Sequence, residues 1–144
     1  MWFSKKEANK TPNKAPKGQV TTKAVGDAAE SIALEYLYKA GLTLQETNYR
    51  TPGRGGGEID LIMKDTDGTL VFIEVRQRAS QSHGGAGASI GAVKQKRIVF
   101  AARHYLMRYK SLPPCRFDVV LIHGGMRAVD APVIEWLRSA FDAF

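Results

Sequence analysis

Two segments of mainly aliphatic and aromatic residues carry four charged side chains that could act together: Glu58, Asp60, Glu74 and Arg76. The segments EIDLIMK and TLVFIEVRQR alternate around the turn sequence DTDG, a pattern that predicts a β-hairpin. A three-residue turn centred on Asp67 places Asp60 opposite Glu74. The same register places Glu58 opposite Arg76. Because successive side chains of a strand point to opposite faces, all four charged side chains are expected on one face, with an apolar surface on the other.

Two carboxylates that face each other across a strand pair repel, and a hard divalent cation removes that penalty. Mg²⁺ binds through one or two carboxylates and keeps several waters, and it can polarise a phosphoryl oxygen or activate water. The spacing therefore favours a site for Mg²⁺ or Mn²⁺ at Asp60 and Glu74. The alternative is a Glu58–Arg76 salt bridge beside two solvated acids. The aliphatic neighbours of both acids count against that alternative.

The remaining sequence predicts the elements that position this hairpin. Apolar residues recur at helical spacing in two stretches, and alternating or aliphatic runs predict further strands. We expect a helix over 22–40, a strand over 42–50, a loop over 51–57, a mobile glycine-rich loop over 79–91, a helix over 92–110, a strand over 116–122, a short strand around 127–130 and a final helix near 134–142. Residues 1–21 are Lys-rich and too polar to form a core, so we expect a disordered basic tail before one domain over 22–144.

The net charge of +7 and the pI of about 9.7 favour a polyanionic partner. Net charge is +5 over residues 1–23, −5 over 24–75, +8 over 76–110 and −1 over 111–144. The +8 segment contains no acidic residue, so it suits phosphate contacts beside the carboxylates. The alternative is that basic side chains coat one exposed helix face.

Composition excludes several classes of protein. The chain of 144 residues contains one cysteine, Cys115, so an internal disulfide and a cysteine-rich metal site are both excluded. No apolar run approaches the roughly 18 residues of a membrane span, and no apolar region follows the first residues as in a signal peptide. We therefore expect a cytoplasmic protein that does not act at a membrane.

Several motifs together resemble the YraN family of small, uncharacterised bacterial proteins. They are GEIDLI at 57–62, FIEVRQR at 72–78, GGAxAS at 84–89, KQKR at 94–97 and CRFDVV at 115–120, within roughly residues 24–142. The YraN family is similar in turn to restriction-endonuclease-like nucleases, notably archaeal Holliday-junction resolvases. The resemblance implies an α/β fold with a mixed central sheet and a core of order αβββαβ, to which the sequence adds a C-terminal helix.

The resemblance also implies a catalytic set of Glu30, Asp60, Glu74 and Arg76, in which the three acids hold Mg²⁺ or Mn²⁺. Arg76 stands where these nucleases have lysine. Arginine stabilises phosphate charge but cannot act as a general base, because its pKa is above about 12. Metal-bound hydroxide suffices, or Lys94 or Lys96 substitutes, or the protein binds without cutting.

Three functions follow as alternatives. The first is a metal-dependent nuclease or resolvase-like protein that cleaves DNA phosphodiesters. The second is a non-catalytic nucleic-acid-binding module that serves DNA repair or recombination, and the third is a protein-interaction domain whose charge is incidental. In the first two, the side chains expected to contact nucleic acid are Arg76, Arg78, Lys94, Lys96 and Arg97. Resolvase-like relatives dimerise, so the resemblance also allows a homodimer.

Overall fold

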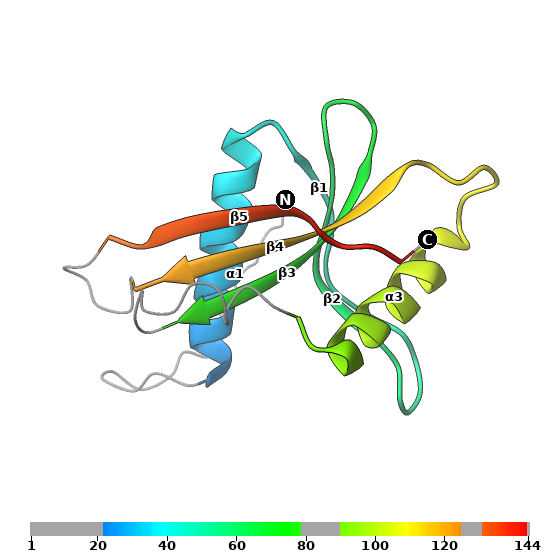
Figure 1. The fold of residues 1–144 in the computed structure, drawn as a ribbon, viewed down its shortest axis with the longest axis horizontal. Helices are drawn as coiled ribbons and strands as arrows, with labels where there is room; N and C mark the ends of the chain where they lie inside the picture. Colours follow the sequence, from blue (N-terminus) through cyan, green and yellow to red (C-terminus); the bar gives the residue numbers. More distant parts are fainter. Residues whose placement is uncertain (1–21, 79–89, 125–130, 144) are drawn as a thin grey trace, which may run out of the picture.

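The computed structural model describes residues 22–78, 90–124 and 131–143, with side chains described from residue 27. Its elements are α1 (Thr22–Lys39), β1 (Thr43–Arg50), β2 (Glu58–Lys64), β3 (Leu70–Arg78), α3 (Ala92–Leu106), β4 (Cys115–His123) and β5 (Val133–Phe141) (Figure 1). The predicted order αβββαβ is confirmed. The predicted tail over 1–21, most of the loop over 79–91 and the strand around 127–130 lie outside the described residues.

The five strands form one sheet in the order β1-β2-β3-β4-β5. Strands β3 and β4 pair in parallel and the other neighbours pair antiparallel, so the sheet is mixed as predicted. Parallel neighbours need a long crossover, and α3 lies in the segment that connects β3 to β4. Among the described residues, no helix is long and apolar enough to cross a membrane.

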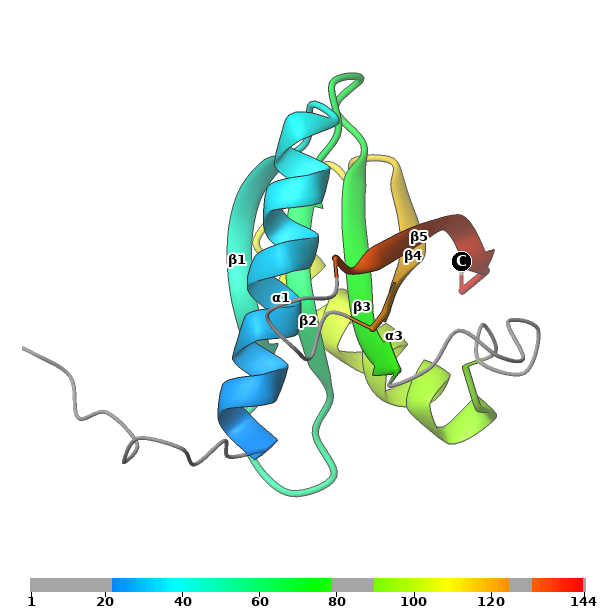
Figure 2. The ribbon, with the colours of Figure 1, turned by 90° about the vertical axis from the view of Figure 1, so that its left-hand side faces the viewer.

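One helix covers each face of the sheet (Figure 2). On one face, Ala29, Ala33 and Leu37 of α1 pack on side chains of β2, β3 and β4. On the other face, Ile98, Ala101, Ala102, Tyr105 and Leu106 of α3 pack on a cluster that includes Phe72 and Phe117. The interior strands are therefore apolar on both sides. Val93, near the start of α3, lies outside this packed face, because 74% of Val93 is exposed.

The predicted register of the β2–β3 hairpin is confirmed next to the turn, whereas the predicted pairs Asp60–Glu74 and Glu58–Arg76 lie beyond the backbone pairing. Leu61 pairs with Ile73, Ile62 with Phe72 and Met63 with Val71, as the turn sequence and the alternation require. The turn closes where the Asp65 amide donates to the Thr69 carbonyl at 2.9 Å. Counted from the turn, the backbone pairing of these strands ends at Leu61 and does not include Asp60.

The predicted C-terminal helix near 134–142 is wrong, because Val133–Phe141 forms the strand β5. This strand pairs antiparallel with β4 and shifts register between Phe117 and Val119. The nine-residue segment VIEWLRSAF is apolar at both strand and helix spacing, so its period does not decide between them. The free edge of β4 favours the strand, because the backbone N–H and C=O groups of buried β4 would stay unpaired without a neighbouring strand.

Candidate functional site

Asp60 lies where β2 separates from β3. Its Oδ2 atom accepts a hydrogen bond from the Val75 amide at 2.8 Å, so the carboxylate replaces the backbone partner that a longer ladder would supply. Ile59 packs on the α3 face whereas Leu61 packs on the α1 face, although residues two apart normally share a face. The apolar surface expected on one side of the hairpin is therefore interrupted, since the chain changes orientation at Asp60 and Ile59 faces α3.

Glu74 is buried beside Asp60 with an incomplete set of hydrogen bonds. Its side chain is in the interior, with the residue 8% exposed, and its Oε1 atom finds no hydrogen-bond partner among the described residues. Burial, and then the Asp60 charge, raise the pKa of Glu74 to about 7. Burial also raises the pKa of Asp60, against the lowering effect of the Val75 amide. Burial and mutual repulsion therefore disfavour two charged carboxylates here, and a proton or a bound cation can relieve this penalty.

Lys94 of α3 reaches this acid pair from the helix above the sheet. Its Nζ lies 3.5 Å from Glu74 Oε2 and 3.7 Å from Glu58 Oε2. The docking of Ile98 and Ala101 against the sheet fixes the helix in that place. Of the two lysines considered from the sequence, Lys94 and Lys96, the fold therefore brings Lys94 to the acids.

The other basic residues expected to contact nucleic acid lie on β3, beside the loop of residues 51–57, and at a separate pocket on α3. Arg76 of β3 lies close enough to Glu74 to lower the pKa of that carboxyl, which partly opposes the effect of burial. Arg78 ends β3, and its Nε is buried without a hydrogen-bond partner among the described residues. Arg97 is exposed and donates from Nε to the Gly56 carbonyl at 3.4 Å. Lys96 lines a different pocket on α3, away from the acid pair.

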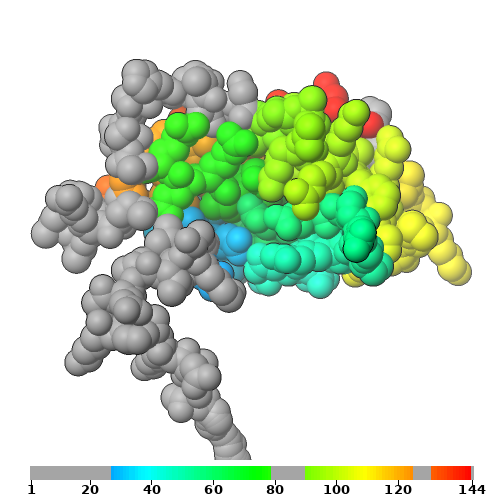
Figure 3. Space-filling model, turned by 90° about the horizontal axis from the view of Figure 1, so that it is seen from below, coloured from blue at the N-terminus to red at the C-terminus, as the bar shows by residue number. Residues whose placement is uncertain are grey.

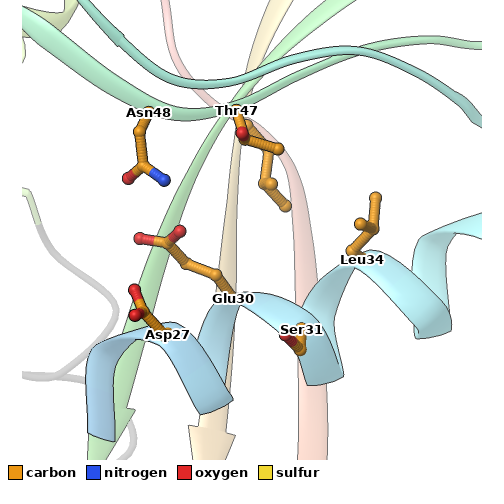
Figure 4. Close-up of a pocket in the computed structure, with 7 residues that line it drawn as sticks. Asp27, Glu30, Ser31, Leu34, Thr47 and Asn48 are labelled. Carbon is orange, nitrogen blue, oxygen red and sulfur yellow. The ribbon is translucent and has the colours of Figure 1, made fainter. Parts of the chain in front are cut away.

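Glu30 occupies a pocket of its own in the described part of the chain. It lines a cavity of about 210 Å³ between α1 and β1, with Asp27, Thr47 and Asn48 among its neighbours (Figure 4). Within residues 27–78, 90–124 and 131–143, no three Asp, Glu, His or Cys side chains form a group that could hold a metal ion. The structure thus brings together Asp60 and Glu74, and the role of Glu30 as a third ligand stays a prediction.

Sequence reasoning missed the loop of residues 51–57 as part of this region. Its last glycine, Gly57, packs on α3, and Glu58 follows directly and contacts both Lys94 and Arg50. The available signal was the run of glycines beside two arginines in RTPGRGGGE. The loop therefore connects the acid pair to a second group of basic residues.

Comparisons with known proteins identify the family. Residues 29–122 match the model of the uncharacterised protein family UPF0102, the designation of the YraN family. A UPF0102 protein of Polaromonas naphthalenivorans is 65% identical, with 99% of each chain covered. The UPF0102 protein of Herminiimonas arsenicoxydans is 50% identical, with 83% of this chain and 87% of that protein covered. The chain therefore belongs to the uncharacterised family UPF0102.

Proposed function

We propose that this protein is a metal-dependent nuclease or resolvase-like protein that hydrolyses DNA phosphodiesters. The observation that carries the proposal is the pair formed by buried Glu74 and half-buried Asp60, in which Glu74 Oε1 lacks a hydrogen-bond partner among the described residues and Lys94 Nζ lies 3.5 Å from Oε2. A restriction-endonuclease-like fold is part of the proposal. It is supported by the αβββαβ order and by the mixed sheet.

The donor set fits a divalent cation such as Mg²⁺ or Mn²⁺. Asp60 and Glu74 offer carboxylate oxygens, the ligands that hard cations prefer, and an unpartnered buried oxygen is otherwise costly. When bound, the metal would polarise a phosphoryl oxygen and activate a water. The Val75 amide fixes Asp60 in orientation, so this ligand does not have to reorganise.

Lys94 is proposed to supply the positive charge that the lysine of related nucleases supplies. In hydrolysis, water attacks phosphorus, negative charge grows on the phosphoryl oxygens and one P–O ester bond breaks. A preoriented ammonium beside that charge stabilises the transition state more than it stabilises the substrate. Glu58 and Glu74 hold Lys94 between them, and Arg76 adds charge from the sheet.

The test is cleavage of labelled single-stranded, linear duplex and four-way-junction DNA with Mg²⁺, Mn²⁺ or EDTA. We expect metal-dependent cleavage that D60N and K94M each reduce about 10²-fold or more. K39M is the control for the loss of one lysine, because the Lys39 side chain is 74% exposed on α1, and it should retain activity within about 3-fold. Circular dichroism confirms that each variant is folded.

The second candidate is a DNA-binding module of the same fold that does not cut. The observation that favours it is Arg76 in the position of the usual lysine. Metal-independent DNA binding by a folded wild-type protein that cleaves none of these substrates would refute the nuclease and select this candidate. In that case D60N should bind DNA as well as the wild type or better, since it removes one negative charge near phosphate.

A further inference from the structure

A small polar cavity adjoins the acid pair at the loop between β1 and β2. Its volume is about 200 Å³, and it is lined by Arg50, Arg97, Glu58, Thr51 and the glycines of the loop. Figure 3 shows the loop (turquoise) lying against α3 (yellow-green). The cavity is smaller than the roughly 300 Å³ at which pockets for small organic molecules begin, so it suits a small ion.

Hydrogen bonds and close packing hold the loop in one shape. The Gly57 amide donates to Thr51 Oγ1 at 2.8 Å, and the Thr51 amide donates to the Gly57 carbonyl at 3.1 Å. A Cβ atom on Gly57 would lie 1.9 Å from the Arg97 carbonyl oxygen, so the absence of a side chain lets the loop lie on α3. A site that is already formed does not lose affinity to ordering on binding.

The chemistry of the lining is that of an anion site. Arg50 and Arg97 carry planar guanidinium groups, whose donors match the oxygens of phosphate. The Arg97 Nε bond to Gly56 orients one of these groups. Glu58 contributes one negative charge, which Lys94 offsets at 3.7 Å and Arg50 at 3.9 Å. Glu58 therefore leaves the two arginines with an excess of positive charge.

Two ion pairs connect the cavity to the acid pair. Glu58 lines the cavity and contacts Lys94, and Lys94 contacts Glu74. We propose that this cavity binds one backbone phosphate of the nucleic acid, next to the phosphate held at the acid pair. The proposal rests on the nucleic-acid substrate of the proposed function and deepens it. Arg50 and Arg97 then set the position of the strand.

The experiment measures the anisotropy of fluorescein-labelled single-stranded and duplex oligonucleotides in EDTA at several salt concentrations. R50Q and R97Q are each expected to weaken binding about 5- to 10-fold and to reduce the salt slope by about one phosphate contact. R54Q is the matched control, because Arg54 lies in the same loop and is exposed but does not line the cavity. It should weaken binding less than about 2-fold.

Two results would overturn the subsite. One is an R54Q loss as large as that of R50Q, which would mean general attraction to the loop. The other is unchanged affinity in R50Q, a variant that should fold because 73% of the Arg50 side chain is exposed. Failure of the nuclease proposal looks different: the wild type would then bind through both arginines in EDTA, yet cleave no DNA with metal added.

Discussion

Replacing Glu74 with glutamine is expected to stabilise the metal-free protein at pH 8. Burial and the neighbouring Asp60 raise the pKa of Glu74 from 4.5 to about 7. The folded protein therefore holds this proton more tightly than the unfolded chain does. The stabilisation from the proton is complete below pH 4.5 and is lost as the pH rises towards 7. Glutamine is neutral throughout, so the variant does not lose stability over this range.

The structure sets the size of the effect. A pKa change from 4.5 to about 7 corresponds to at most about 3 kcal/mol of unfolding free energy above pH 7. The pKa of about 7 already includes the effect of Lys94, but the buried glutamine amide needs hydrogen-bond partners where the carboxyl stood, which offsets about 1–2 kcal/mol of this. We expect a net gain of about 1–2 kcal/mol at pH 8, or about 4–8 °C in Tm, and almost none at pH 4.5.

The assay is urea or thermal unfolding of wild type and E74Q in EDTA between pH 4.5 and 8. E35Q is the control, because the Glu35 side chain is 70% exposed on α1 and should change stability by less than about 0.5 kcal/mol. The reasoning is refuted if E74Q is less stable than wild type at pH 8, or if its gain is the same at both ends of the range. Under the proposed function, added Mg²⁺ raises the Tm of the wild type and not that of E74Q.

Two further substitutions test the packing around the site. D118N should lower the free energy of unfolding by about 2–4 kcal/mol in urea titrations. The reason is that Asp118 is 1% exposed and accepts a hydrogen bond from the Trp136 indole N–H at 2.9 Å, within a charged network. A loss below about 1 kcal/mol would contradict this. G57A should cost more than about 2 kcal/mol in the same measurement, since its Cβ would meet the Arg97 carbonyl at 1.9 Å. G91A, where nothing lies within 4 Å of an added Cβ, should stay within about 0.5 kcal/mol, and equal effects of the two glycine variants would refute the close packing of the loop.

The sequence predicted the hairpin and its register because two local rules agree there. The alternation over EIDLIMK and TLVFIEVRQR allows one assignment of faces, and the DTDG turn sets which residues pair. The closeness of Asp60 and Glu74 follows from that register. The separation of the strands at Asp60 does not follow, because it depends on a side chain that takes the Val75 amide.

Contacts between distant segments decided the rest. Whether 133–141 became strand or helix depended on the open edge of β4, which lies far away in the sequence. Lys94 and Lys96 are equivalent as sequence, but the docking of α3 directs Lys94 to the acids and Lys96 to another pocket.

By itself, then, the sequence determined the order of the elements as far as β4, the pairing of the hairpin near its turn and the two central acids, because these depend on local periodicity and turn chemistry. Only the tertiary structure decided which lysine serves those acids and that the glycine loop joins Arg50 to Arg97, since both depend on how α3 packs on the sheet.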